Sequence, residues 1–312
     1  MKYIVKAEDE GITVKELLFE RMGLSKAFVK HLKFIDNGII LNQEKVTVRR
    51  VLHSGDVLTL ALDDERTAEH LTPVNIPVDI VYEDNDVLIP NKPPFMPTHP
   101  SHLHHGDTLA DALAYKYSKD GLPFVFRPVN RLDRNTSGIT LIAKNRISAA
   151  KLTEAMRNGK ILKQYIAILD GEPPQDEGII ETYIKRADKS IIVRRNCSEN
   201  EGGDYALTKY KVLCRHDRKS LVLATPKTGR THQLRVHFSG LNCAILGDEL
   251  YGSESHLIQR HALHALSLSF PHPQTSKPLL VTAPLPDDMA LLIKELFGIQ
   301  PDDLLSKLPL GK

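Results

Sequence analysis

The sequence predicts an α+β fold in two parts, a small N-terminal α/β domain over residues 1–62 and a larger domain over residues 77–312. In the larger part, pairs of strands alternate with isolated helices, which favours a mixed, mostly antiparallel sheet over a doubly wound parallel one. Residues 63–76 between them are polar and acidic, as is typical of a linker. The length of 312 residues fits two domains at about 100–200 residues each.

The N-terminal domain is predicted from two short helices followed by short strands. Apolar residues recur at helical spacing over residues 14–22, behind the N-capping residue Thr13, and Gly23 ends this helix. Ser25 is expected to cap the second helix. The apolar residues expected to face inward there are Phe28, Val29, Leu32 and Phe34. Turn residues such as Asn37 then separate short strands that continue to Leu60.

Three lysines of the second helix, Lys26, Lys30 and Lys33, are spaced so that they share its other face. The pieces GITVKELL, GLSKAFVKHL, NGIILNQEKV and HSGDVLTL, in this order, resemble the alpha-L RNA-binding domain, which is named after a small-subunit ribosomal protein. This resemblance implies that the three lysines bind RNA phosphates. The alternative is an ordinary solvated helix face.

The larger domain is predicted to begin with the segments VDIVYE and DVLIPNKP as two strands joined at Asp84 and Asn85. Further strands are expected at residues 139–143, 164–169, 207–213 and 220–225. Helices are expected from Thr108 to Tyr117, from Ser148 to Asn158 and from Pro286 to Leu296.

Charge distribution and cysteine content indicate which kinds of partner and site the protein could have. The net charge of +2 does not by itself indicate nucleic acid, but residues 218–247 hold five Lys/Arg and no Asp or Glu. Such a stretch is either a phosphate-contacting surface or a solvated strand, and charge alone does not separate the two. The three cysteines are odd in number and far apart, which predicts neither a disulfide framework nor a zinc site and indicates a reducing cytoplasm. No apolar stretch reaches the roughly 18–20 residues of a membrane span.

The segment PVNRLDRNTSGITLIAKN, residues 128–145, is the first chemical signal. It is a loop of turn-forming residues that enters an apolar strand, and loops held by a rigid sheet often carry catalytic groups. Asp133 lies there between Arg131 and Arg134, whose positive charges favour an ionised carboxylate. From these residues alone, Asp133 could equally form a turn or pair with Arg134.

Three further segments carry side chains suited to a nucleic-acid site. ILKQYIAILDG alternates like a half-buried strand and contains Tyr165. In KTGRTHQLRVHFSGLNCAILGDELYG, a helix is expected to open at Thr228, with Arg230 and His232 in its first turn and Arg235 away from the core. RHALHALSLSFPHP is an alternating strand closed by proline.

Together these segments resemble the RluA-type family of pseudouridine synthases. That family carries H-R-L-D-x-x-T-S-G, K-x-Y-x-A, G-R-x-H-Q-[LI]-R-x-H, G-D-x-x-Y-G and L-H-A-x-x-L-x-F, and all five motifs occur here in order, with Asn130 in place of the first histidine. The resemblance implies that Asp133 is the catalytic carboxylate and that Arg235 pairs with it. It also implies that Tyr165 stacks on a flipped uridine and assists the final proton removal, and that Arg131 fills the space the base leaves.

The resemblance further implies that Leu268 packs on the other side of the base, and that Arg230 and His232 contribute to RNA binding. It implies no metal and no cofactor. The partner is expected to be RNA, ribosomal rather than transfer RNA, with no membrane and a monomeric enzyme. Loss of the histidine at Asn130 favours one alternative, a non-catalytic RNA-binding or ribosome-assembly protein. A glycoside hydrolase, the other alternative, needs two carboxylates, and the motifs offer one.

Overall fold

The computed structural model describes residues 2–24, 26–61, 71–101, 104–188 and 190–311. Its helices are α1 (Val14–Glu16), α2 (Lys26–Phe34), α3 (Leu109–Lys119), α4 (Arg146–Arg157), α5 (Gln233–Gly240), α6 (Asp287–Phe297) and α7 (Pro301–Lys307), with single turns η1 (Ala7–Asp9), η2 (Leu17–Arg21) and η3 (Glu199–Glu201). Its strands are β1 (Lys2–Ile4), β2 (Ile39–Leu41), β3 (Glu44–Lys45), β4 (Val57–Leu60), β5 (Asp79–Glu83), β6 (Val87–Lys92), β7 (Ser137–Ile139), β8 (Ile142–Ala143), β9 (Leu162–Asp170), β10 (Glu177–Arg186), β11 (Arg194–Cys197), β12 (Asp204–His216), β13 (Lys219–Pro226), β14 (Leu263–Pro271) and β15 (Pro278–Thr282).

The N-terminal domain packs its helices on an antiparallel sheet of order β1-β4-β2-β3. Thr13 caps α1 as expected, through a capping box with Glu16. Phe28 is buried as expected, but the inward position expected for Phe34 is wrong, because its side chain is 79% exposed. Six residues after Phe28, at about 3.6 residues per turn, Phe34 has rotated off the apolar stripe. The cap expected at Ser25 lies outside the described residues.

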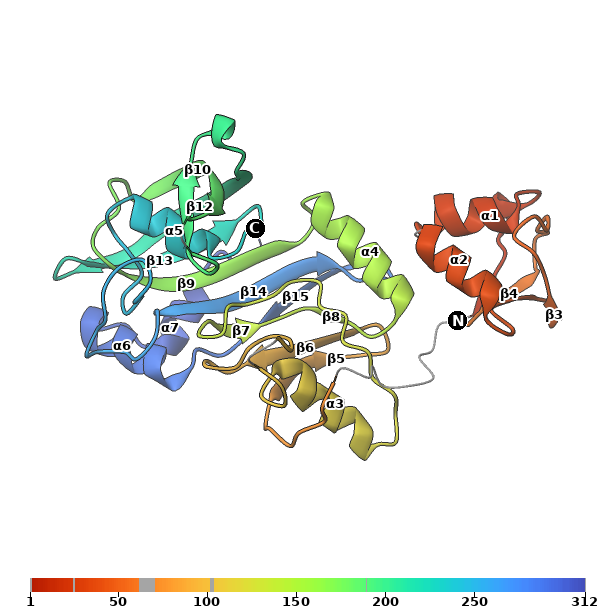
Figure 1. Ribbon diagram of the computed structural model, residues 1–312, viewed down its shortest axis with the longest axis horizontal. Coiled ribbons are helices and arrows are strands. Elements are labelled where there is room, and N and C mark those ends of the chain that lie inside the picture. The colour runs from red at the N-terminus through yellow and green to blue at the C-terminus, as the bar shows by residue number, and fades with distance from the viewer. Residues whose placement is uncertain (1, 25, 62–70, 102–103, 189, 312) are drawn as a thin grey trace.

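The larger domain is built on one long sheet of order β11-β10-β12-β13-β9-β14-β7-β6-β5, with β15 on β14 and β8 on β6 (Figure 1). Every pairing is antiparallel except β14 with β7. The mixed, mostly antiparallel sheet and the α+β class are therefore confirmed. Sequence patterning located β12 and β13 but not β10 and β11, in which few residues are fully buried.

Helices cover both faces of this sheet. Along β6, Val87 and Ile89 pack into a cluster with α4, whereas Leu88 between them packs into a cluster with α3. Successive side chains of a strand point to opposite faces, so this unbroken apolar run indicates a strand buried on both sides. At the other end, α5 and α6 pack with β9 and β13 in the largest apolar cluster.

The expected linker, residues 63–76, falls partly on residues outside the described ranges. Its described part is attached to the larger domain. Leu71 is buried beside α3, and the Thr72 amide donates to Asp111 Oδ1 at 2.9 Å. The N-terminal domain meets the larger one at α4, where Ile147 is buried among N-terminal apolar residues and the Arg146 guanidinium lies 5.8 Å from the Phe28 ring centroid. None of the described helices is long and apolar enough to cross a membrane.

Candidate active site

A cavity of about 780 Å³ opens between the ends of the central strands. Pockets of about 300–1,000 Å³ are typical of small-molecule sites, so this one has room for a nucleotide. All four segments that carry the predicted motifs contribute to its lining, together with residues 97–99, Ser101, His104 and the last two residues of α4. The predicted residues on its lining are Arg131, Asp133, Tyr165, Arg230, His232 and Arg235.

Asp133 lies in the loop between residues 130 and 136, just before β7. Its side chain is 27% exposed, and it is the one carboxylate among the described residues that line the cavity. The loop enters the sheet through Gly138, whose φ is +113° and whose missing side chain leaves room for the Ala265 carbonyl of β14. A side chain at Gly138 would both strain the backbone and clash, so this glycine fixes where the loop ends.

Arg235 reaches Asp133 from α5, with Nη1 3.4 Å from Asp133 Oδ2. Its closer partner is Asp248, which accepts from Nε and Nη2 at 2.7 Å each in a bidentate pair. Burial opposes the guanidinium charge, but the hydrogen bonds and charge of Asp248, with the charge of Asp133, raise the pKa of Arg235. Arg235 therefore brings a fixed positive charge to Asp133, and Asp248 holds it in place.

His232 also faces Asp133, with Nε2 3.8 Å from Oδ2. Its Nδ1 lies 2.8 Å from the Tyr251 hydroxyl, which in turn accepts from the Arg194 amide at 2.8 Å. The Tyr251 proton is free to donate to Nδ1, and in that arrangement the neutral imidazole carries its proton on Nε2, toward Asp133. Burial lowers the pKa of His232 despite the attraction of Asp133, which favours this neutral form.

Tyr165 and Lys163 enter the cavity from β9, two residues apart and therefore on the same face of the strand. Tyr165 is 8% exposed, and burial together with the charge of Asp133 raises the pKa of its phenol, so it stays protonated at neutral pH. Burial lowers the pKa of Lys163 to about 8, and its ammonium donates to the Thr228 carbonyl at 3.1 Å. The sequence pattern predicts Lys163 on this strand but indicates no role for it.

The cavity mouth carries Arg131 and Arg230. Arg131 is exposed, with Nη1 3.2 Å from His99 Nε2, whereas Arg230 Nε donates to the Tyr205 carbonyl at 2.9 Å. Deeper in, Asn130 Oδ1 accepts from the Leu141 amide at 2.7 Å. Asn130 thus ties the Asp133 loop to the strand that follows it, a link that needs an acceptor but no titrating group.

Comparison with known proteins decides the family. A family model described as RNA pseudouridylate synthase matches residues 86–240. The uncharacterised RNA pseudouridine synthase YjbO of Bacillus subtilis is 40% identical, over 91% of this chain and 99% of its own length. Ribosomal large subunit pseudouridine synthase D of Zymomonas mobilis is 34% identical, over 88% and 90% of the two chains. This chain belongs to the RNA pseudouridine synthase family.

Solved structures agree with this assignment. The human protein RNA Pseudouridylate Synthase Domain Containing 1 has a TM-score of 0.59 and 27% identity, covering 76% of this chain and 97% of the human one. Human RNA Pseudouridylate Synthase Domain Containing 4 gives a TM-score of 0.56 at 26% identity, over 70% and 92% of the chains. The protein is therefore an enzyme that converts uridine in RNA to pseudouridine.

The structure corrects the expected position of Leu268 in this synthase. Leu268 is 2% exposed and packs with α4 and β15, in a different apolar cluster from Tyr165, and it does not line the cavity. Leu263, five residues earlier on β14 and about 16 Å away along an extended strand, lines the cavity instead. A register shift between Ala265 and Ser267 interrupts the alternation from which inward positions are counted.

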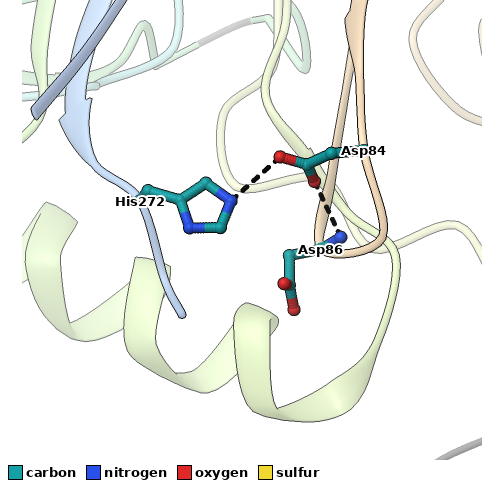
Figure 2. A group of neighbouring side chains, drawn as sticks. All are labelled: Asp84, Asp86 and His272. Atoms are coloured by element: carbon teal, nitrogen blue, oxygen red, sulfur yellow. Dashed lines mark hydrogen bonds and ion pairs between the residues drawn. The ribbon is translucent and has the colours of Figure 1, made fainter. Parts of the chain in front are cut away.

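Outside the cavity, one group of side chains has the composition of a metal site: Asp84, Asp86 and His272 (Figure 2). Asp84 Oδ2 accepts from His272 Nε2 at 2.9 Å, and its Oδ1 accepts from the amides of Asp86 and Val87 at 2.8 Å. Asp86 Oδ1 accepts from side chains at the start of α4. These hydrogen bonds join two strand connections to α4, so the group is accounted for as a structural junction.

Proposed function

We propose that this enzyme isomerises uridines of ribosomal RNA and that Asp133 is its catalytic carboxylate. The observation that carries the proposal is the position of Asp133. It lies in a nucleotide-sized cavity, beside the fixed charge of Arg235, and close enough to Tyr165 for its charge to raise the pKa of the phenol. An ionised carboxylate near the glycosidic bond is the group that the reaction needs, as nucleophile or as base.

The reaction breaks the bond between C1′ of the ribose and N1 of uracil and forms a bond from C1′ to C5. Because the base is stacked inside folded RNA, it first leaves the stack. Arg131 at the exposed mouth is placed to contact the neighbouring bases or phosphates, where a planar permanent cation suits both. Tyr165 and Leu263 offer an aromatic and an aliphatic surface for the uracil ring.

His232 and Arg235 both direct donors at Asp133, and these contacts orient the carboxylate while the base rotates. The buried phenol of Tyr165 stays protonated and can stack on the base. Its oxygen can accept the C5 proton only as its own hydroxyl proton passes to the Asp133 carboxylate, from which that proton is released as N1 takes one up. The proton count closes, because C5 loses the proton that N1 gains in the product.

Ribosomal RNA is supported by two observations. Relatives that match most of this chain are named ribosomal large subunit pseudouridine synthase D, including the one from Zymomonas mobilis. The N-terminal domain presents Lys26, Lys30 and Lys33 as exposed side chains on α2, which suits phosphate contacts in a large folded RNA.

The test is Asp133→Asn, with pseudouridine measured by nucleoside chromatography after incubation with ribosomal or transfer RNA transcripts. We expect turnover to fall by about 10³-fold or more, because the near-isosteric amide cannot act as an anion. RNA affinity should change little. Asp204→Asn is the control, since Asp204 is an exposed carboxylate near Arg230 at the cavity rim. Turnover near the wild-type level in Asp133→Asn would refute the catalytic role, and a preference for transfer RNA would refute the substrate.

A further inference from the structure

The cavity wall contains one buried lysine whose charge is not balanced by any carboxylate of the described residues. Lys163 of β9 is 6% exposed, and its Nζ donates to the Thr228 carbonyl at 3.1 Å. A lysine ammonium has three donors, and this bond to an uncharged oxygen uses one of them. Burial lowers the pKa of Lys163 to about 8, and among the described residues no neighbouring charge opposes the shift. Lys163 therefore presents to the cavity a charge and donors that these residues leave unpaired.

The other cations of the cavity are either exposed or paired. Of the described residues that line it, seven are Lys or Arg and one, Asp133, is a carboxylate. Arg235 is buried, but Asp248 and Asp133 balance its charge. Five of the seven are exposed, so water stabilises their charge, and these are Arg131, Arg134, Arg157, Lys227 and Arg230. Within the described part of the chain, Lys163 is thus the one cation of this lining that is buried without a carboxylate.

The unbalanced charge of Lys163 indicates what kind of ligand atom it meets. Burying a charge without a partner is costly, so a buried ammonium at a binding site favours a ligand that brings the opposite charge. In RNA at neutral pH, uracil and ribose are uncharged and the phosphodiester groups carry the negative charge. The charge of Lys163 therefore points to a phosphate of the bound RNA rather than to its base.

The position of Lys163 on β9 indicates which phosphate this is. Lys163 and Tyr165 leave the same face of the strand two residues apart, about 7 Å along it. The charge of Asp133 contributes to the raised pKa of Tyr165 but not to the pKa of Lys163, so the ammonium lies farther from the carboxylate. A nucleotide whose base contacts Tyr165 and whose C1′ lies near Asp133 therefore has its own backbone within reach of Lys163.

Gly229 leaves the ammonium of Lys163 open to the cavity. A Cβ at this position would lie 3.5 Å from Lys163 Nζ, and Gly229 is itself part of the cavity lining. Its φ is not positive, so the backbone conformation does not require a glycine here. The missing side chain instead keeps an approach to Nζ free for a ligand atom.

We propose that Lys163 binds a nonbridging oxygen of a phosphodiester that flanks the flipped uridine. The inference rests on the proposed function, because that function places the uracil beside Tyr165. Lys163 contacts neither the base nor C1′, and it holds the backbone of the target nucleotide while the base rotates. Its contribution is therefore confined to one phosphate, and the contacts of the exposed cations with other phosphates do not depend on it.

The test combines Lys163→Met with RNA that lacks one charge. Synthetic stem-loops carry the uridine that the wild type modifies, with a neutral methylphosphonate on its 5′ side, on its 3′ side or on neither. In wild type, one of the two methylphosphonates should lower kcat/KM by about 10–100-fold, the loss typical of a charge-assisted hydrogen bond. Lys163→Met should show this loss on ordinary RNA, and that methylphosphonate should then lower kcat/KM by no more than about twofold.

Lys151→Met is the matched control, because Lys151 is a half-buried lysine of α4 that donates to the Pro273 carbonyl away from the cavity. It should respond to the methylphosphonates as wild type does. If Lys163→Met falls below wild type by the same factor on all three RNAs, Lys163 has a structural or base-binding role and the proposal is overturned. A wild-type kcat/KM that neither methylphosphonate lowers would overturn it as well, even if Lys163→Met did not fold.

RNA binding gives a readout that needs no turnover. Lys163→Met should lower the salt slope of log K for ribosomal RNA by about 0.7–0.9, the value for one phosphate contact, and Lys151→Met should leave it unchanged. Lys163→Arg, which keeps the charge, should retain the wild-type slope. Equal slopes for Lys163→Met and wild type would contradict the proposal. If wild type forms no pseudouridine, the proposed function fails, and the salt slope still decides whether Lys163 binds phosphate.

Discussion

The two domains of this enzyme differ in how many charged side chains they bury. Among the described residues between 2 and 61, Asp9 is the one buried charged side chain, and the core there is otherwise apolar. The larger domain buries Lys92, Lys163, Arg235, Asp248 and Arg260 around the cavity. Because uncompensated buried charge is expensive, each of these groups needs bonded partners, and those partners also fix its position.

This difference in buried charge matches the different demands that RNA binding and isomerisation place on a protein. Binding a polyanion needs exposed cations on a stable support, and small errors in their positions are tolerated because the attraction is long-ranged. Isomerisation needs one carboxylate held to within a fraction of an ångström. The catalytic domain therefore depends on a charged network that is sensitive to change, whereas the N-terminal domain should tolerate substitutions on its surface.

The sharpest test of this contrast is Asp248→Ala. Removing the carboxylate leaves Arg235 buried without its bidentate partner, and Arg235 is 7% exposed. We expect the free energy of unfolding to fall by about 3–5 kcal/mol. The matching change in the N-terminal domain is Glu8→Ala, which breaks a solvent-exposed pair with Lys6 and should cost less than about 1 kcal/mol. Urea unfolding followed by circular dichroism measures both, and equal losses would remove the distinction.

Lowering the pH should also affect the stability of the two domains differently. Burial lowers the pKa of His237 to about 4 and of His264 to about 3, and lowers that of His261 well below its usual value. Below pH 6.5 the unfolded chain binds protons at these positions and the folded chain does not, so stability falls as the pH falls toward these values. The expected slope is about 2–4 kcal/mol per pH unit near pH 5.5.

The lowered pKa of Glu83, about 2, adds to this loss only below pH 4.5, so histidines control the range between pH 6.5 and 4.5.

Since the chain has no tryptophan, amide hydrogen exchange is the suitable probe of each domain. Peptides of the larger domain should lose protection on acidification before those of residues 2–61. His237→Gln should make the slope shallower, and a slope that is unchanged would exclude this histidine as a cause.

The smallest expected effect lies on α2. Replacing Lys26, Lys30 and Lys33 with Gln should leave folding and kcat near wild type and weaken RNA binding. Each lost phosphate contact lowers the salt slope of log K by about 0.7–0.9, so the slope should drop by about 2–3 in all. Lys2, Lys6 and Lys45, exposed elsewhere on the same domain, give the matched triple control. Equal salt slopes for the two triple variants would rule out an RNA-binding role for α2.

Local signals in the sequence were enough for most of the fold. The helix starts at Thr13 and Thr108 and the alternating strands depend on neighbours within a few residues, and the structure has them where they were expected. The helix expected to open at Thr228 instead begins at Gln233, because His232 before it adopts a left-handed φ of +58°. That conformation is set by contacts with Tyr251 and Asp133, which no local pattern contains.

The site was predicted as a set of residues but not as a network. A charge-assisted pair has its atoms about 2.7–2.9 Å apart, but Arg235 Nη1 lies 3.4 Å from Asp133 Oδ2, and the closer contacts of the guanidinium are to Asp248. Asp248 lies in a turn, and its pairing with Arg235 depends on how the chain after α5 folds back, which the sequence does not show. Lys92 gave no signal, because its partners are the backbone carbonyls of Pro93, Met96 and Arg134, which every residue type has. The pairing of Arg260 with Asp288 joins residues 28 positions apart, which no local pattern contains.

Helix α4 extends from the core of the N-terminal domain to the cavity, so its length sets the distance between them. Ile147 near its start is buried in the N-terminal core, and Arg157 at its end lines the cavity; Figure 1 shows α4 between the two bodies. Twelve residues of α-helix span about 18 Å. If the N-terminal domain holds RNA phosphates and the cavity receives the base, as proposed, a helix of this length fixes the distance between the two positions. Target choice would then depend on how far a uridine lies from a phosphate ridge in the folded RNA, so unrelated sequences of the same shape could share one enzyme.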